Sequence, residues 1–388
     1  MLSYWEQESL QKIDFIVVGA GLMGMQTALE LRRRAPKARI VLLERHAPPR
    51  GAGTQNAGFA CFGSPGELLD DVARVGRDAA LALVERRYRG LLMLRQRHGD
   101  AALAIVEHCG HELLAQDSAV DAAVLEDLNS DLRRVFGEDV FHLRPDLLLR
   151  YGFAREFVSA LVHTRFEAAL DSGRLSLSLR RQLRAADIEL LCGINVTALE
   201  CLARGVEVRG VDAAGEEITF RARAAALCGN AALPDLLRTL GSAAESLPDI
   251  RPGRGQVLVT EALPDLKFNG TFHADRGFMY FRRLGDRVLL GGGRNRDFDA
   301  ESTQQRGLNE SIQTFLDDYL RTVILPGARP VINSRWSGIM AFTADKQPCV
   351  KQIAAGFVVG FACNGMGVAL SAAASEQCAD CVIEAAES

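Results

Sequence analysis

The sequence predicts a globular α/β protein with two domains, or with one domain that carries a large insertion. Its 388 residues exceed the size at which a single hydrophobic core usually stops growing. A strand, a glycine-rich turn, a helix and a second strand follow one another over residues 13–44, and another glycine-rich turn between strand and helix lies within 356–374. The composition, 48% hydrophobic and 24% charged, suits a well-buried core.

Composition and charge argue against several kinds of partner. A formal net charge of -4 does not favour nucleic acid. Nine cysteines are scattered along the chain with no secretory leader before them, which indicates a reducing cytoplasm. The close pair Cys378 and Cys381 lacks the second pair or the histidine that would complete a zinc site, so we expect no bound metal.

One apolar stretch has the length of a membrane span. Residues 353–375 contain no charged side chain and are long enough to cross a bilayer. Asn364, Gly365 and Gly367 divide the stretch into a strand and a separate helix. We therefore expect no membrane association.

The first predicted unit is a βαβ motif. Residues 13–18, IDFIVV, are β-branched and aromatic, as in a parallel strand buried on both faces. Apolar residues then recur at helical spacing from Met25 until Pro36, and ARIVLLE at 38–44 forms the second strand. The crossover between the two strands should be right-handed.

The turn inside this unit has the glycine spacing of a dinucleotide site. Gly19 permits a tight turn, Gly21 lets backbone amides approach a pyrophosphate, and Gly24 lets the helix pack closely on the strand. The positive end of the helix dipole then faces the anion. Glu44 ends the second strand, where a carboxylate accepts hydrogen bonds from ribose hydroxyls. The expected contacts in this unit are Gly19, Gly21, Leu22, Met23, Gly24 and Glu44.

The C-terminal turn separates the two common dinucleotides. NAD and FAD share the ADP half, so the N-terminal unit fits both. Residues 356–361, GFVVGF, read as a strand, and after the turn at 364–367 small residues continue as a helix through Ala374. Binding of NAD does not require a second turn of this kind. The amides at the N-terminus of the helix after the turn would instead stabilise the pyrimidine edge of a flavin, which becomes anionic on reduction.

Several motifs together resemble a known family. They are the N-terminal unit, RGAGTQNAG at 50–58, GFMYFRRLGDRVLLGGGRN at 277–295, Trp336-Ser337-Gly338 with ADKQP at 344–348, and the closing FACNGMGVAL. In this order they resemble the D-amino-acid oxidase-like family of FAD-dependent oxidoreductases, which includes glycine and sarcosine oxidases and γ-glutamylputrescine oxidoreductase. The resemblance covers most of the chain. It implies a Rossmann-like FAD-binding domain built from discontinuous segments, plus an α+β substrate domain with a mixed sheet.

The resemblance also assigns FAD contacts outside the first unit. It implies that the loop at 53–58 passes beside the pyrophosphate and under the isoalloxazine, that Val196 meets the adenine, and that 364–367 meet the pyrimidine. For Asn56, Asn230 and Asn364, turn chemistry alone is an equal alternative, because asparagine tolerates left-handed backbone. The residues implied are Arg45, Gly53, Thr54, Asn56, Ala57, Gly58, Val196, Gly229, Asn230, Asn364, Gly365, Met366 and Gly367.

On the substrate side the sequence departs from the family pattern. Amino-acid oxidases of the family usually place a carboxylate-binding arginine where this chain has Met340, and a thioether cannot replace a guanidinium. This departure, and the opening Ser3-Tyr4-Trp5, resemble the γ-glutamylputrescine oxidoreductase branch. Leu289 stands where sarcosine oxidases carry an oxygen-activating lysine, so oxidase and dehydrogenase both stay open and the electron acceptor is unknown.

Two residues are the catalytic candidates. Tyr280 and Arg282 alternate in a predicted strand and therefore share one face, where they could meet a polar substrate group. The alternative for Arg282 is a pairing with Asp286 at the adjacent turn. His273, upstream in the same hairpin, has a structural role as its default.

We expect FAD to bind non-covalently. The region that supplies the linking cysteine in sarcosine oxidases reads GIMAFT here, and the N-terminal loop offers no histidine. Cys61 and Cys349 are nearby in sequence, but small buried hydrophobes are their default role.

These expectations define an organisation and a function. The FAD-binding domain comprises 1–75, 150–245 and 330–388, and the substrate domain comprises 76–149 and 246–329. The first substrate segment has a helical pattern, and the second contains the strands QVLVTEAL, FMYFRR and RVLLGG. The protein is predicted to oxidise a C–N bond of a small amine or amino acid to an imine. The alternatives are a carboxylate-binding oxidase that uses Arg282, and a non-catalytic flavin-binding sensor or assembly subunit.

Overall fold

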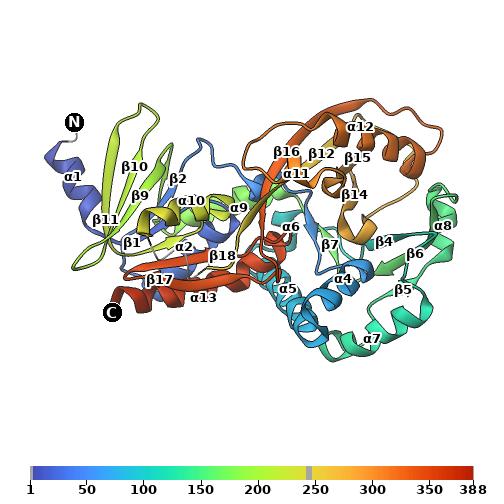
Figure 1. Ribbon diagram of the computed structural model, residues 1–388, viewed down its shortest axis with the longest axis horizontal. Helices are drawn as coiled ribbons and strands as arrows, with labels where there is room; N and C mark the ends of the chain where they lie inside the picture. Colours follow the sequence, from blue (N-terminus) through green and yellow to red (C-terminus); the bar gives the residue numbers. More distant parts are fainter. Residues whose placement is uncertain (1–2, 242–246, 388) are drawn as a thin grey trace.

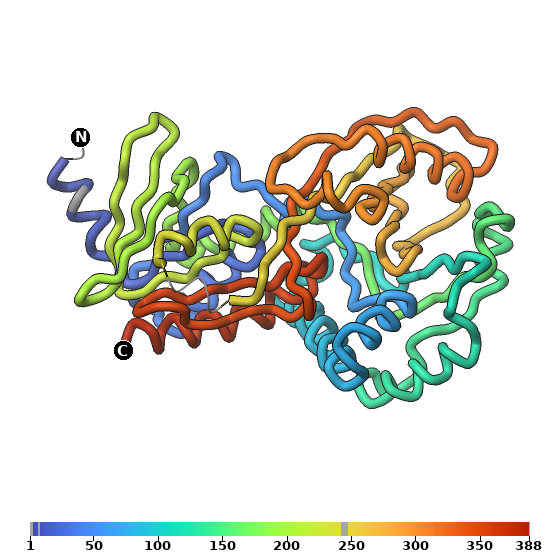
Figure 2. The backbone as a smooth tube through the Cα atoms, viewed as in Figure 1, coloured from blue at the N-terminus to red at the C-terminus, as the bar shows by residue number. Residues whose placement is uncertain are grey.

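The computed structural model describes residues 3–241 and 247–387, which form two lobes side by side (Figure 1). Each lobe is built around one eight-stranded sheet. Both chain ends lie in the first lobe, and colours from distant parts of the sequence alternate within each lobe (Figure 2). The chain therefore crosses between the lobes several times, as expected for discontinuous domains.

The first sheet contains the predicted βαβ unit. Its order is β17-β18-β11-β1-β2-β8, and β10 joins β9 to β11. The strands β18, β11, β1, β2 and β8 are parallel, so their carboxyl ends share one edge. The bounds are β1 Ile13–Val18, β2 Ile40–Glu44, β8 Glu189–Cys192, β9 Asn195–Cys201, β10 Val206–Val211, β11 Glu217–Leu227, β17 Cys349–Ala354 and β18 Phe357–Phe361.

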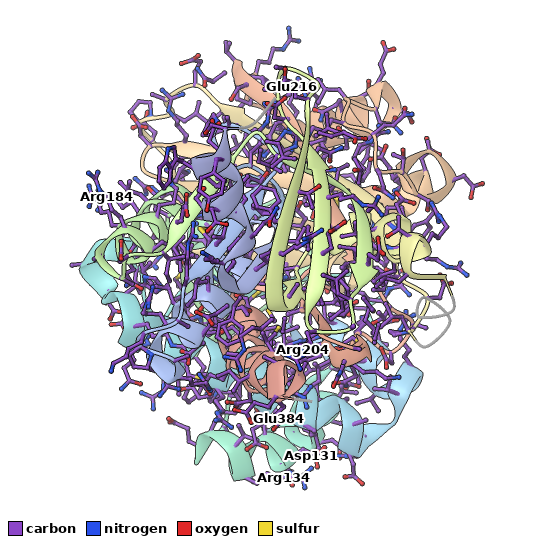
Figure 3. All side chains as sticks on the ribbon, turned by 90° about the vertical axis from the view of Figure 1, so that its left-hand side faces the viewer. Asp131, Arg134, Arg184, Arg204, Glu216 and Glu384 are labelled. Carbon is purple, nitrogen blue, oxygen red and sulfur yellow. The ribbon has the colours of Figure 1, made fainter. Side chains whose placement is uncertain are left out.

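Two different layers cover this sheet. Phe15 and Val17 of β1 face a core formed with the long helices on one side. Ile16 and Val18 face the β9–β11 meander and α10 on the other side. Glu216 and Arg204 mark opposite ends of the meander in Figure 3. Burial on both faces explains the uninterrupted apolar sequence of β1.

The second sheet spans the other lobe. Its order is β16-β12-β15-β14-β13-β4-β6-β5, with one parallel pair, β13 and β4. A short pair, β3 Phe59–Ala60 and β7 Ala168–Ala169, lies apart from it. The bounds are β4 Gly110–Ala115, β5 His142–Leu143, β6 Val158–Thr164, β12 Arg251–Thr260, β13 Thr271–Ala274, β14 Met279–Leu284, β15 Arg287–Gly292 and β16 Ile332–Phe342.

Alternation along β14 divides the second sheet into an apolar face and a polar face. Phe281 stacks on Phe272 at 4.6 Å between ring centroids, within a core that includes α8 and α12 residues. Tyr280 and Arg282 therefore point to the opposite face, together with His273, which pairs with Tyr280 across the ladder. The prediction that Tyr280 and Arg282 share one face is confirmed.

The helices agree with the main periodic segments. Residues 65–98 form α4 and α5, and α13 extends well beyond Ala374. No helix among the described residues is both long enough and apolar enough to cross a membrane. The bounds are α1 Tyr4–Gln11, α2 Leu22–Arg34, α3 Ala52–Gln55, α4 Pro65–Val75, α5 Arg77–His98, α6 Asp100–Leu103, α7 Ala122–Phe136, α8 Pro145–Tyr151, α9 Ser172–Ala185, α10 Leu233–Leu237, α11 Phe298–Glu301, α12 Glu310–Tyr319 and α13 Gly367–Glu387; short helical turns are η1 Asn230–Ala232, η3 Asp275–Gly277, η4 Arg294–Arg296 and η5 Leu320–Ile324.

Several strands of the second sheet lie where the sequence did not suggest them. The segment 76–149, expected to be helical, contributes β4 to the middle of the sheet and β5 to its edge. The strands β6 and β16 also belong to this sheet, although their residues fall in segments expected for the FAD-binding domain. The proposed domain boundaries stay a prediction, and these strands indicate where the chain passes between the lobes.

Candidate active site

Three turns meet at one edge of the first sheet. The Gly19–Gly24 turn follows β1, Gly229 and Asn230 follow β11, and the Asn364–Gly367 turn follows β18. Because these strands are neighbours and parallel, their carboxyl ends open on the same side. The helices that follow the outer two turns lie together, since Gln26 Nε2 of α2 donates to Ser371 Oγ of α13 at 2.7 Å. The later turn thus opens at the same edge as the earlier one.

The glycines of the first turn fit a dinucleotide. Gly19 has a φ of +101°, and a Cβ there would lie 2.7 Å from the carbonyl oxygen of Cys228. A Cβ on Gly24 would overlap the carbonyl oxygen of Gly19. By contrast, a Cβ on Gly21 would meet no atom within 4 Å, so the turn is open where a pyrophosphate approaches. Leu22 and Met23 begin α2, whose first amides have no intrahelical acceptor.

Glu44 is fixed at the end of β2. Its Oε2 accepts from the amide of Ala20 at 3.0 Å, and its Oε1 accepts from the amide of His46 at 2.9 Å. Each oxygen keeps a further lone pair for a ribose hydroxyl. Arg45 is exposed beside it. Burial, together with the positive charge of Arg45, Arg306 and Arg50, lowers the pKa of His46. The positive charge of these three arginines suits a bound diphosphate.

The loop that begins with α3 lies between the two lobes. Gly53 packs beside Leu22 of the first turn, where an added Cβ would lie 3.0 Å from the leucine side chain. On the other side, Trp336 of β16 donates from Nε1 to the carbonyl oxygen of Gln55 at 3.0 Å. Thr54 Oγ1 accepts from the amide of Gly51. The loop is therefore in the position expected of a segment that borders both the pyrophosphate and the isoalloxazine.

Asn56 and Asn364 have their side chains engaged in turns. Asn56 Oδ1 accepts from the amide of Gly58 at 2.9 Å, and its Nδ2 donates to the carbonyl oxygen of Gly53 at 2.8 Å. Asn364, with a φ of +47°, accepts from the amide of Thr343 at 2.7 Å. These contacts favour the turn-chemistry alternative for both side chains.

Asn230 and Val196 are placed differently. Asn230 also has a positive φ, of +52°, and its Nδ2 donates to the carbonyl oxygen of Ile339 at 3.3 Å. Its Oδ1 is buried without a hydrogen-bond partner among the described residues. Val196 lies half-buried in β9 opposite Gly210. The unpaired amide oxygen keeps Asn230 available for a ligand hydroxyl.

The side chain of Arg282 in β14 forms hydrogen bonds with two segments that lie outside the second sheet. Its Nη1 donates to the carbonyl oxygens of Gly58 and Leu170, each at 2.7 Å, and more weakly to that of Ala57. Asp286 is not among its acceptors in the described part of the chain. Burial lowers the pKa of this guanidinium. A substrate carboxylate would have to compete with backbone oxygens for Nη1, so this geometry favours a role in holding the loop after α3 rather than in binding substrate.

Tyr280 packs against two glycines, Gly255 and Gly291, which we call the glycine floor. Its ring covers Gly291, where a Cβ would come within 2.5 to 2.7 Å of three ring and hydroxyl atoms. Its hydroxyl lies 3.7 Å from the Cβ position of Gly255 and has no hydrogen-bond partner among the described residues. Burial raises the pKa of Tyr280 to about 12. The hydroxyl is therefore protonated at neutral pH and can donate to a ligand.

Arg294 is a residue of the site that the sequence reasoning missed. Its guanidinium carbon lies 4.2 Å from the centroid of the Phe342 ring, and its Nη1 lies 3.0 Å from the Cβ position of Gly253. Gly253 pairs with Met340 across the β12–β16 ladder. Arg294 thus brings a guanidinium close to the backbone position where Met340 replaces the expected arginine. The sequence signal that could have identified Arg294 is its place in the GGGRN motif at 291–295.

The guanidinium of Arg294 is unpaired. It makes no hydrogen bond or ion pair with any residue in 3–241 or 247–387, although burial lowers its pKa. A partly buried cation without an acceptor is costly unless a ligand supplies one. The Arg294 guanidinium and the Tyr280 hydroxyl each lie close to a glycine of β12, Gly253 and Gly255, which are alternate residues on one face of that strand.

The fold and the three turns fit a dinucleotide-binding protein with a second lobe built on its own sheet. A family model described as FAD dependent oxidoreductase matches residues 14–381. The chain belongs to this family of FAD-dependent oxidoreductases, which confirms the predicted cofactor, the fold class and the enzyme class. The glycine turn and Glu44 fit the ADP portion of FAD, and the bound flavin supplies an acceptor for two electrons.

Solved structures share the fold over nearly the whole chain. Glycine oxidase from Geobacillus kaustophilus superposes with a TM-score of 0.75 at 20% identity, covering 96% of this chain and 95% of that chain. L-proline dehydrogenase from P. horikoshii gives 0.75 at 14% identity, with 96% and 94% covered. Iminodiacetate oxidase from Chelativorans sp. BNC1 gives 0.70 at 19% identity, with 95% of each chain covered.

A curated relative matches only a short segment. Aklavinone 12-hydroxylase DnrF from Streptomyces peucetius is 40% identical over 83 residues, which make up 19% of this chain and 17% of that protein. Such a short match carries no information on the substrate of this chain.

Replacing Gly24 by alanine should remove FAD from the purified protein. The added Cβ overlaps the Gly19 carbonyl, so the turn must open. Overpacking of this kind costs about 1–3 kcal/mol, which corresponds to about 5- to 150-fold in FAD affinity if the cost falls on binding. The flavin content of the purified protein measures the effect. Gly51→Ala is the control, because a Cβ there meets no atom within 4 Å. Full flavin content in Gly24→Ala would contradict the assignment.

Proposed function

We propose that the protein oxidises the C–N bond of a small amino acid to an imine, which water then hydrolyses, and that Arg294 holds the substrate carboxylate. The observation that carries the proposal is the unpaired Arg294 guanidinium beside the unpaired Tyr280 hydroxyl, on the face of the second sheet that meets the flavin loop. The names of the similar structures, glycine oxidase and L-proline dehydrogenase, agree with this chemistry.

The residues of the site would bind and orient the substrate. The planar fork of Arg294 can donate two parallel hydrogen bonds to one carboxylate, and stacking on Phe342 holds the fork in place. Tyr280 can donate from its hydroxyl to the same carboxylate, because its pKa of about 12 keeps it protonated. Such a clamp fixes the α-carbon relative to the flavin, which is the main protein contribution to this chemistry.

Apolar residues beside the clamp would exclude water. Val257, Val259 and Leu289 form a small buried cluster against which Ala57 and Trp336 pack. Leu289 occupies the position of the expected lysine, and its apolar side chain offers no charge to assist oxygen. We therefore propose that an acceptor other than oxygen reoxidises the flavin.

A plain amine is the second candidate substrate. Met340 favours it, because its methyl group lies close to Gly255 and narrows the space over the glycine floor. In that case Arg294 would serve a different polar group of the substrate. One experiment separates the two substrate classes.

The experiment uses pairs of compounds that differ only in the carboxylate. The FAD-loaded protein is mixed anaerobically with amino acids and with the amines obtained by their decarboxylation, and loss of the oxidised flavin absorbance is followed. We expect bleaching by at least one amino acid and none by its amine partner. Bleaching by both members of each pair would favour the amine reading. A protein that no compound bleaches would contradict the proposed oxidation of these substrates.

Further parts of the proposal concern location and attachment. All nine cysteines are free, as in a reducing compartment, so we propose a cytoplasmic location. Because the formal net charge is -4, we also propose that nucleic acid is not a partner. We also propose non-covalent FAD, held mainly by the segments 1–75, 150–245 and 330–388. Denaturation should release all of the flavin into the supernatant, and flavin retained in the precipitate would contradict this part.

A further inference from the structure

A buried cluster of ionisable side chains lies beside the candidate active site. We call it the Cys61 cluster; its members are Cys61, Glu67, Glu112, Glu167 and His273. They come from the segment after β3, from α4, from β4, from the residue before β7 and from β13. The ring of Phe59 contacts both His273, at 5.1 Å between centroids, and Tyr280, at 5.8 Å. The cluster is thus separated from the proposed clamp by one aromatic ring.

Three ligand atoms in this cluster converge. One ligand atom each of Cys61, Glu167 and His273 lies within 4.8 Å of the other two, and all three residues are buried. His273 is only 4% exposed, yet its Nε2 has no hydrogen-bond partner among the described residues. The nearest carboxylate oxygen, Oε2 of Glu167, is 3.9 Å away. A buried ring nitrogen left in this state lacks the partner that such atoms normally have.

The other atoms of the three side chains are already held in place. His273 Nδ1 faces Glu67 Oε2 at 3.2 Å, which is the outer contact that a metal-bound histidine usually makes. Glu167 Oε1 accepts from the amides of Phe62 and Gly63, at 3.0 and 3.2 Å, and leaves Oε2 free. The cluster therefore brings a nitrogen, an oxygen and a sulfur close together, with His273 and Glu167 each held by contacts of their other ring or carboxylate atom.

Several groups of the cluster have shifted pKa values. Burial raises the pKa of the Cys61 thiol well above its usual range, and the negative Glu167 and Glu67 raise it further. Burial also raises the pKa of Glu167, and it raises that of Glu112 to about 7. Despite burial, the pKa of Glu67 is lowered instead, chiefly by the charge of His273. The convergence of the three ligand atoms, and not these shifts, is the basis for a metal site.

We propose that Cys61, Glu167 and His273 bind one divalent transition-metal ion of the zinc type, with Glu67 as the outer partner of His273. A thiolate and an imidazole select borderline and soft ions rather than magnesium or calcium. Binding replaces the thiol proton by a metal–sulfur bond and releases that proton to solvent. The Met366 thioether also lies close to the thiol, with its Sδ 3.6 Å from Cys61 Sγ. The ion would connect β13 of the second sheet to the segments beside β3 and β7.

The test is a measurement of metal on the FAD-loaded protein. After dialysis against a chelator and then metal-free buffer, the protein is titrated with Zn²⁺ in competition with a chromophoric chelator, and its metal content is measured by mass spectrometry. We expect one equivalent per chain, lost in Cys61→Ser and in His273→Ala. Glu67→Gln should weaken binding by about 10- to 100-fold, because it disturbs only the outer contact.

Matched controls make each outcome decisive. Cys109→Ser removes another buried thiol, whose Sγ donates to the carbonyl oxygen of Val106, and it should leave the bound zinc unchanged. The flavin content of each variant shows whether it folds. If a ligand variant does not fold, the zinc affinity of Glu67→Gln decides whether the proposal holds. A wild-type protein that takes up no zinc, cobalt, nickel, iron(II) or manganese overturns the proposal. So does a zinc equivalent that Cys61→Ser and His273→Ala both retain.

Discussion

Replacing Arg294 by methionine should lower kcat/KM for the carboxylated substrate by about 100- to 1000-fold. Removing one partner of a buried, hydrogen-bonded charge pair costs about 2–5 kcal/mol, and each 1.4 kcal/mol corresponds to about tenfold. Methionine keeps an apolar side chain beside Phe342, so the packing of the site is largely preserved. Anaerobic flavin bleaching at varied substrate concentration measures the effect.

The control is a neighbouring arginine in the same helical turn. Arg296 stacks on Phe315 at 4.4 Å and is exposed, so Arg296→Met should leave kcat/KM within about twofold of the wild-type value, as surface substitutions usually do. Both variants should retain full FAD content. An Arg294→Met protein that bleaches as fast as the wild type would remove Arg294 from the substrate site. Loss of flavin binding on replacement of Arg282 would agree with the hydrogen bond that the Arg282 side chain donates to the loop after α3.

Replacing Arg87 by methionine should destabilise the protein by about 3 kcal/mol. Breaking a buried ion pair by removing one partner costs about 3–5 kcal/mol, because the other charge stays buried. Arg87 is 2% exposed, and its Nη1 donates to Asp71 Oδ2 and to the carbonyl oxygen of Phe62, each at 3.0 Å. Lys346 also pairs with Asp71 at 2.5 Å, which places the cost at the low end of the range. The midpoint of urea unfolding measures the loss.

A more exposed pair within α4, the helix that carries Asp71, gives the comparison. Arg74 binds Asp70 at 3.2 Å near the surface, so Arg74→Met should cost less than about 1 kcal/mol. Similar midpoints for the two variants would contradict the view that the Arg87–Asp71 pair is a buried structural contact. Because Lys346 connects this pair to the loop after β16, Arg87→Met should also loosen the segment that approaches the flavin turn.

The local elements were readable because neighbouring residues determine them. Strand β1 and its glycine turn follow from an apolar run and from backbone that only glycine adopts easily, as the φ of +101° at Gly19 illustrates. The strand β15 Arg287–Gly292 coincides with the predicted RVLLGG segment. By contrast, β4 was missed. Its first five residues are all buried, so it lacks the alternation of a half-exposed strand, and its partners β13 and β6 lie far away in sequence.

The sequence by itself determined the family and the cofactor, because glycine spacing and strand ends act through the backbone of short segments. Only the tertiary structure decided which arginine is free. Arg282 and Arg294 are both in the same motif, yet the first donates to carbonyl oxygens of a distant loop, and the second, stacked on Phe342, has no hydrogen-bond acceptor among the described residues. The same holds for Cys61, Glu167 and His273, which are brought together from three separate segments. What a polar side chain can do depends on the partners that remain for it, and folding of the whole chain determines those partners.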